Sequence, residues 1–124
     1  MTIKPDPVEP LRVRSKIWLE VDGHSFLGDG RLRLLEAVAE AGSINGAAKA
    51  LGISYRKAWS QLHDMEQHAP FALLEKRTGG KDGGASLLTQ DSLDILERFR
   101  ALRSEAQLLV DECFARHFPE GEPL

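Results

Sequence analysis

Cysteine is almost absent from this sequence, and two kinds of stabilising site are excluded with it. Cys113 is the one cysteine among 124 residues, so the chain holds no internal disulfide and no site built from several cysteines. The four histidines, His24, His63, His68 and His117, are scattered along the sequence, and none forms an i, i+4 pair. We therefore expect them on the surface, with no metal site and no cofactor.

Long apolar runs are also lacking. No apolar stretch approaches the ~20 residues that a membrane helix requires, and the first ten residues contain no apolar segment typical of a signal peptide. We therefore expect a cytoplasmic location and no membrane contact. No Ser/His/Asp or Cys/His combination stands out, so the chain is not expected to be an enzyme.

The composition is that of one globular domain, with 42% hydrophobic and 28% charged residues. The net charge of −3 argues at first against a nucleic-acid partner, but the charge is unevenly distributed. Residues 43–84 carry six basic and four acidic side chains, whereas residues 85–124 carry four basic and eight acidic ones. The middle of the chain is therefore the part most suited to bind an acidic partner such as nucleic acid.

Residues 43–61 have the pattern of two short helices joined by a tight turn. Ser43 can cap the first helix, Gly52 can adopt the left-handed conformation that ends it, and Ser54 can cap the second. The second helix begins with basic and polar side chains. This pattern predicts a helix-turn-helix, in which the start of the second helix enters the major groove of DNA.

The expected architecture is mainly α with small β: an N-terminal β-hairpin, a tri-helical core, a second hairpin and a long last helix. Residues 1–10 are expected to be a flexible tail, residues 11–118 the domain, and residues 119–124 a second tail. Three helices are expected at roughly 30–41, 44–51 and 55–68, with Asp29 capping the first. The core candidates are Leu35, Val38, Leu51, Trp59, Leu62 and Met65.

The first hairpin is predicted by alternation. Residues 11–21 alternate apolar and polar side chains, which favours a strand. Asp22-Gly23 is a hairpin turn signal, and residues 24–28 can return as a short second strand.

The second hairpin follows the helix-turn-helix and is therefore a candidate wing. Residues 73–77 and 85–88 read as strands around a tip, Thr78 to Gly84, that has four glycines in seven residues. Such a tip permits close approach of the backbone to phosphates. A nucleotide-binding loop is the competing interpretation, but the tip does not match the GxxxxGK[ST] spacing.

The last helix is expected from about residue 90, capped by Thr89, to residue 117. Its apolar residues recur at alternating steps of four and three, which is an a/d seam typical of a dimerising helix. The candidate dimer-interface residues are Ile95, Phe99, Leu102, Ala106, Leu109 and Cys113.

This order of elements resembles the N-terminal DNA-binding domain of ModE-type regulators, the molybdate-responsive bacterial transcription factors. AEAGSINGAAKALGISYRKAW (39–59) and LLEKRTGGKDGGASLLT (73–89) carry the resemblance, which covers roughly residues 11–118. LysR-type regulators are similar across the helix-turn-helix, but their wing has no such glycine tip. In the family the domain is a dimeric winged helix, whereas molybdate binds to C-terminal domains that this sequence does not match.

The resemblance implies sequence-specific binding to a palindromic double-stranded DNA operator by a homodimer, with no molybdate site expected in this chain. A protein-interaction module without DNA binding is the alternative. The candidate DNA-binding residues are Ser43, Ser54, Tyr55, Arg56, Lys57, Ser60 and Gln61 of the helix-turn-helix, and Lys76, Arg77, Thr78, Gly79, Gly80 and Lys81 of the wing.

Overall fold

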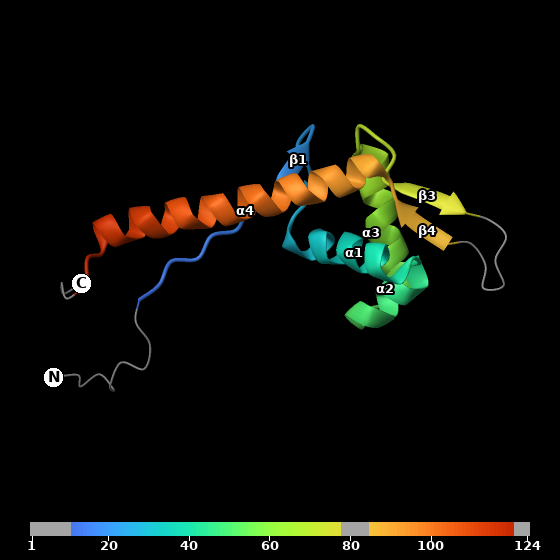
Figure 1. Cartoon of the computed structure of the whole chain (residues 1–124), viewed down its shortest axis with the longest axis horizontal. Helices are drawn as coiled ribbons and strands as arrows, with labels where there is room; N and C mark the ends of the chain where they lie inside the picture. The colour runs from blue at the N-terminus through green and yellow to red at the C-terminus, as the bar shows by residue number, and fades with distance from the viewer. Residues whose placement is uncertain (1–10, 78–84, 121–124) are drawn as a thin grey trace.

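The computed structural model describes residues 11–77 and 85–120, which form a mainly helical chain with two small hairpins (Figure 1). In chain order the elements are β1 (Leu19–Val21), β2 (His24–Leu27), α1 (Asp29–Ala41), α2 (Ile44–Leu51), α3 (Tyr55–His68), β3 (Leu74–Arg77), β4 (Ala85–Leu88) and α4 (Gln90–His117). The predicted order of hairpin, three helices, hairpin and long helix is confirmed. The tip of the second hairpin lies outside the described residues, as do residues 1–10 and 121–124.

Three of the helices begin where the sequence predicted. The hydroxyls of Ser43, Ser54 and Thr89 each accept a hydrogen bond from the backbone N–H three residues on, at 3.0, 3.0 and 3.2 Å. Helix α1 differs, because its cap residue is Gly28 and no side chain caps it. The prediction that Asp29 caps this helix is therefore wrong. Asp29 is the first residue of α1, where its charge favours the positive helix end.

The core lies among α1, α2, α3 and the first turns of α4. Leu35, Val38 and Met65 are fully buried in it, as predicted, and Leu62 is nearly so. Two other core predictions are wrong, because Leu51 is 36% and Trp59 42% exposed. The core also contains five residues from other elements that are not among the core candidates: Phe26, Leu27, Leu73, Leu96 and Phe99.

The first hairpin is shorter than predicted. The turn is as expected, with positive φ at both Asp22 (49°) and Gly23 (80°). Strand β2 has only four residues before α1 begins, so residues 11–18 have no strand beside them in the described structure. They run extended along α4 instead (Figure 1). The predicted alternation is present in this segment, because Val13, Ser15 and Ile17 are half-buried and the residues between them are exposed.

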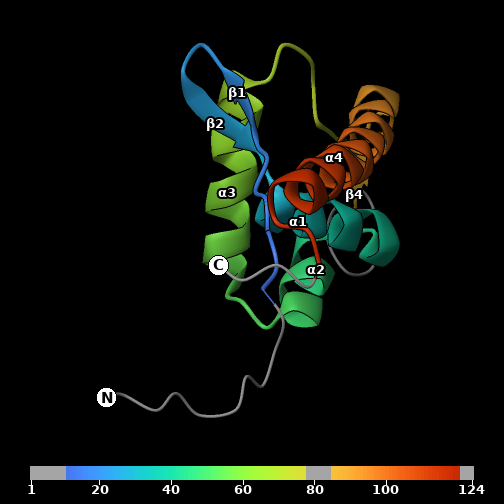
Figure 2. The ribbon, with the colours of Figure 1, turned by 90° about the vertical axis from the view of Figure 1, so that its left-hand side faces the viewer.

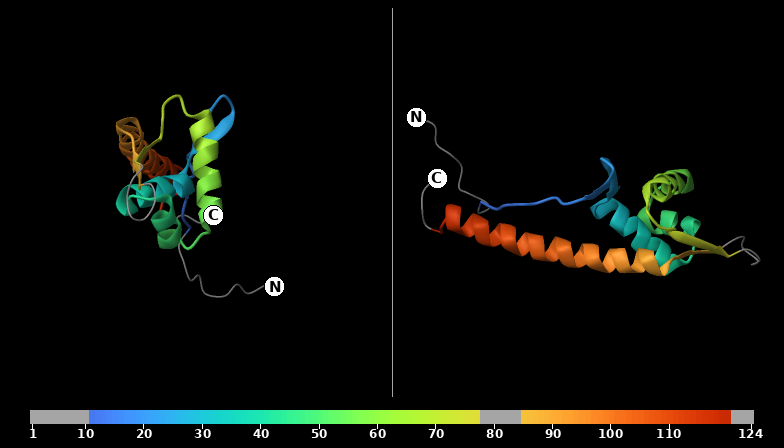
Figure 3. Two further views of the ribbon diagram at one scale, coloured as in Figure 1. Left: turned by 90° about the vertical axis from the view of Figure 1, so that its right-hand side faces the viewer. Right: turned by 90° about the horizontal axis from the view of Figure 1, so that it is seen from above.

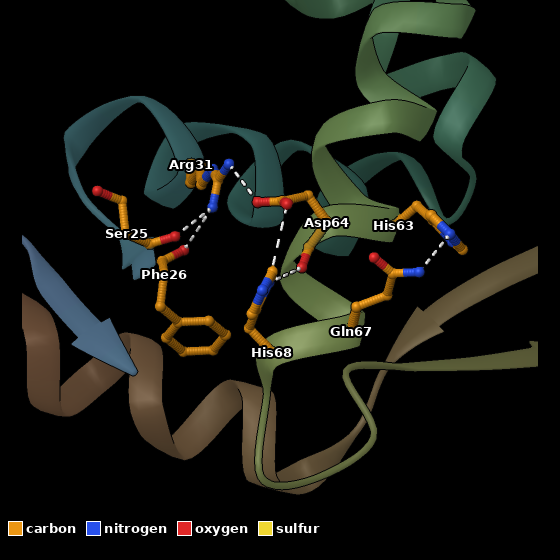
Figure 4. Close-up of polar contacts among 7 residues, drawn as sticks. All are labelled: Ser25, Phe26, Arg31, His63, Asp64, Gln67 and His68. Carbon is orange, nitrogen blue, oxygen red and sulfur yellow. Dashed lines mark hydrogen bonds and ion pairs between the residues drawn. The ribbon is translucent and has the colours of Figure 1, made fainter. Parts of the chain in front are cut away.

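Arg31 joins three elements at the end of the first hairpin (Figure 4). Its guanidinium donates to the carbonyls of Ser25 and Phe26 at 2.9 and 3.2 Å, and to the Asp64 carboxylate at 2.7 Å. Asp64 lies on α3, so one side chain fixes the angle between β2, α1 and α3. His68 lies beside this group, with its ring 4.4 Å from that of His24 between centroids, and is half-buried rather than exposed as expected.

The backbone of Leu73 is a junction between α3, the wing and α4. Its N–H donates to the Glu66 carboxylate of α3 at 2.8 Å. Its carbonyl accepts from the Thr89 N–H at 3.0 Å and from the Ser92 hydroxyl at 2.8 Å. Ser92 and Leu73 are both fully buried, so the bond between them is protected from water. The three bonds together hold the wing base against two helices.

Gly46 marks a close approach of α2 to the end of α1. A Cβ at this position would lie 2.8 Å from the Ala41 Cβ and 2.9 Å from the Ser43 hydroxyl oxygen. We expect Gly46→Ala to lower the free energy of unfolding by ~1–3 kcal/mol, because both neighbours must move. Chemical denaturation measures this change. Gly30→Ala is the control, since nothing lies within 4 Å of its Cβ. An equally stable Gly46→Ala variant would contradict the prediction.

Candidate nucleic-acid interface

The turn between α2 and α3 has the geometry of a helix-turn-helix. Gly52 adopts φ 68°, and its N–H donates to the Lys49 carbonyl at 3.2 Å. The Ile53 N–H closes the turn on the Ala48 carbonyl at 3.0 Å. Ala47 and Ala58 are fully buried, which allows the two helices to pack closely.

The outer face of α3 presents most of the predicted contact residues to solvent. Tyr55, Arg56, Lys57 and Ser60 are exposed, and Gln61 is half-buried. The buried face of the same helix consists of Ala58, Leu62 and Met65. Ser43 and Ser54 are occupied as helix caps, so a DNA contact from either would be in addition to that role.

Sequence reasoning missed two exposed aromatic residues on this helix. The Trp59 indole stacks on the His63 imidazole, with 4.6 Å between ring centroids and 10° between ring planes. With Tyr55 they form an i, i+4, i+8 row on α3. The spacing of this row is present in the sequence, but the position of Trp59 beside the apolar face of Ala58, Leu62 and Met65 favours the core instead.

The wing stands beside this face of α3. Strands β3 and β4 pair antiparallel, with Leu74 opposite Leu88 and Arg77 opposite Ala85. Lys76 is exposed on β3, and the Ser86 N–H donates to the Gly42 carbonyl at 3.0 Å, which ties β4 to the end of α1. The predicted tip residues, Thr78, Gly79, Gly80 and Lys81, lie outside the described structure.

A groove of about 360 Å³ separates α3 from β3. Trp59 and His63 line one side, and Leu74 and Lys76 the other. Glu66 lies in the groove and holds the start of the wing through Leu73. The groove therefore has α3 on one side and the wing on the other, and the Glu66–Leu73 bond holds the two together. Its aromatic and cationic lining residues are Trp59, His63 and Lys76.

Helix α4 extends well beyond the core, as the side view and the view from above show (Figure 1; Figure 3, right). The residues of the predicted dimer seam fall into a buried group and an exposed group along this helix. Phe99 is buried in the core of its own chain and Ile95 packs against that core, whereas Leu102 and Leu109 are 44% and 60% exposed. Ala106 is half-buried and Cys113 exposed. The part of the seam available to a second chain therefore begins at Leu102.

Within residues 11–77 and 85–120, no group of three or more His, Cys, Asp or Glu side chains is placed to hold a metal ion. No helix in the same ranges has both the length and the apolar character needed to cross a membrane.

Comparison with known proteins places this geometry in a family. The model of the bacterial regulatory helix-turn-helix proteins of the lysR family matches residues 30–91. The molybdenum transport protein ModE of Azotobacter vinelandii is 38% identical over 105 residues, which are 85% of this chain and 39% of that protein. The DNA-binding transcriptional dual regulator ModE of Escherichia coli is 34% identical over 93 residues, 75% of this chain and 36% of that protein.

Among solved structures, the DNA-binding domain of CbnR in complex with DNA has a similar fold. The TM-score is 0.52 at 30% sequence identity, and the match covers 71% of this chain and 95% of that one. This chain spans less than two fifths of the length of either ModE protein. The resemblance to ModE-type regulators, with LysR-type proteins as relatives, is confirmed. Since the family model covers half of the chain, the chain belongs to the bacterial regulatory helix-turn-helix proteins of the lysR family.

Proposed function

We propose that this chain binds double-stranded DNA sequence-specifically as a homodimer and thereby regulates transcription. The observation that carries the proposal is the exposed face at the start of α3, where Tyr55, Arg56 and Lys57 stand free of the core beside a wing held at fixed separation. Winged helix-turn-helix proteins insert this part of the second helix into the major groove. The DNA complex of the related CbnR domain supports the proposal.

Helix α3 and the wing have different proposed roles in DNA binding. Arg56 can bond bidentately to a guanine edge, and Gln61 can bond to an adenine edge, so α3 carries the sequence readout. Lys76, Arg77 and Lys81 belong to the wing, with Thr78, Gly79 and Gly80, and meet the phosphate backbone. Ser43, Ser54 and Ser60 supply hydroxyls near the same backbone. The proposal includes no molybdate site and no catalytic role for any residue.

A homodimer would present two copies of this interface, one to each half-site of the operator. The exposed leucines on α4 have no cover within the described chain, and pairing of two α4 helices would cover them. A two-fold dimer then reads a palindrome whose half-sites lie about one helical turn, or a multiple of it, apart.

The test is selection of duplexes from a random pool by the purified chain, followed by footprinting. We expect the enriched sequences to be palindromic, with two protected segments on one face of the DNA. Failure to enrich any sequence, together with salt-independent binding, would exclude the proposal in favour of a protein-interaction module.

Replacing Lys76 with alanine should weaken binding to the selected operator and to random duplex by about the same factor. A phosphate contact carries no sequence information, and its loss should lower the slope of log K against log salt by ~0.9 per contact. Titrations at several salt concentrations measure both quantities. Arg33→Ala removes one exposed positive charge from α1, outside the proposed interface, and should leave the slope nearly unchanged. A loss confined to the operator would mean that Lys76 reads bases.

A further inference from the structure

Residues 11–18, here called the arm, form an extended segment that the proposed DNA interface does not use. The arm is docked, because the Ser15 hydroxyl donates to the Gln107 side-chain oxygen at 2.7 Å. The Arg103 guanidinium donates to the Ser15 carbonyl at 3.0 Å. Arg103 is itself positioned by Asp29, with 3.5 Å between the guanidinium Nε and the carboxylate. The arm is therefore ordered in part before any partner arrives, which lowers the entropy cost of binding.

Docking divides the arm into two faces. Val13, Ser15 and Ile17 are half-buried toward the body of the chain, and the residues between them are exposed. The outer face therefore carries three cations in succession at every second position: Arg12, Arg14 and Lys16. Among the residues that the structure describes, none of the three takes part in an ion pair.

The spacing of these cations suits a nucleic-acid backbone. Alternate residues of an extended chain are ~7 Å apart, which is about twice the ~3.4 Å rise per phosphate along one DNA strand. A groove of about 540 Å³ borders the arm, and the residues that line it include Arg12, Arg14 and Lys16 together with Arg103. Asp29 is the one carboxylate lining that groove, so the strip is strongly positive although the whole chain is not.

The position of the arm indicates which DNA it can reach. It lies beside α4 on the side where α2 and the first turns of α3 also lie (Figures 1 and 2). It runs away from the wing, which stands at the opposite end of the molecule (Figure 3). If two α4 helices pair in antiparallel orientation in the proposed dimer, the arms would lie between the two recognition helices.

We propose that the arm is a second DNA-binding element, in which Arg12, Arg14 and Lys16 contact backbone phosphates between the half-sites of the operator. This rests on the proposed function, because it requires a protein that binds DNA through α3. The arm contributes affinity and salt dependence, and α3 contributes the sequence readout.

The test compares two triple variants of the whole chain on the duplex selected by the wild type. Arg12→Ala, Arg14→Ala and Lys16→Ala together should lower the slope of log K against log salt by ~0.9 per lost contact, roughly three per chain. Hydroxyl-radical protection of the backbone between the half-sites should disappear, while protection of the half-sites remains. Arg33→Ala, Arg98→Ala and Arg116→Ala remove the same charge from exposed positions on α1 and α4 and should preserve the central protection.

A further variant separates the docking of the arm from its charge. Ser15→Ala with Gln107→Ala removes the side-chain hydrogen bond and keeps every cation, so central protection should weaken with a smaller loss of slope. The inference is overturned if the arm variant matches the charge control, or if it dissociates the dimer, which would assign the arm to the acidic half of a second α4. If the wild type binds no DNA, the proposed function fails first, and the two failures are thereby distinguished.

Discussion

Replacing Arg56 with alanine should cost ~1–3 kcal/mol of binding free energy per half-site on the selected operator, and about twice that for a dimer. Arg56 is exposed in the first turn of α3, and its guanidinium can form two parallel hydrogen bonds to one guanine. On random duplex that guanine is usually missing, so the loss there should be much smaller. Anisotropy titrations of both duplexes at one salt concentration measure the difference.

The matched control is Arg98→Ala, which removes an exposed arginine from α4. It should change binding to the two duplexes by small and similar amounts. Equal losses on operator and random duplex for Arg56→Ala would show that this residue only anchors a phosphate. The assignment of sequence readout to Arg56 would then be wrong, although DNA binding itself would stand.

Leu102→Asp combined with Leu109→Asp should convert the dimer into a monomer and weaken operator binding by roughly 100- to 10,000-fold. The physical reason is that two linked half-site contacts reinforce each other only while the chains stay together. Both leucines are exposed in the single chain, so the charges should not disturb the core. Sedimentation across a dilution series measures the mass, and circular dichroism verifies that the chain remains folded.

Ser104→Asp with Ala115→Asp adds the same charge to exposed positions on another face of α4. This control should remain dimeric and bind as the wild type does. A wild-type chain that sediments as a monomer at every concentration would defeat the dimer, and the exposed leucines would then need another explanation.

The sequence predicted those features that depend on a few neighbouring residues. Ser54 caps α3 because its hydroxyl meets a backbone N–H three residues away, and Gly52 ends α2 because glycine tolerates a positive φ. Such signals need no knowledge of the rest of the fold. The bounds of α2, α3 and α4 were therefore predictable, and with them the positions of Arg56 and Lys57 at the start of the recognition helix.

The features that the sequence did not predict depend on distant partners. The arm alternates like a strand, yet its partner is the side of α4, which begins more than seventy residues later in the chain. Trp59 is apolar enough for a core but lies exposed on α3. Phe26, Leu73 and Phe99, which come from other elements, are the large side chains that the core buries. The residues of the aromatic row on α3 and the alternating cations of the arm are present in the sequence, but their exposure depends on where those partners lie.

The hydrogen bonds at Leu73 fix the first turn of α4, while the rest of this helix extends away from the core. Helix α4 is ~42 Å long, and its first turn is held to the wing base through the Leu73 carbonyl. The same residue is fastened to α3 through Glu66. A tilt imposed on the far end must either carry the wing with it or break buried hydrogen bonds at ~1–3 kcal/mol for each group left unpaired. In the proposed dimer, a change in the angle at which α4 crosses the second chain would therefore also change the opening between the wing and the recognition helix.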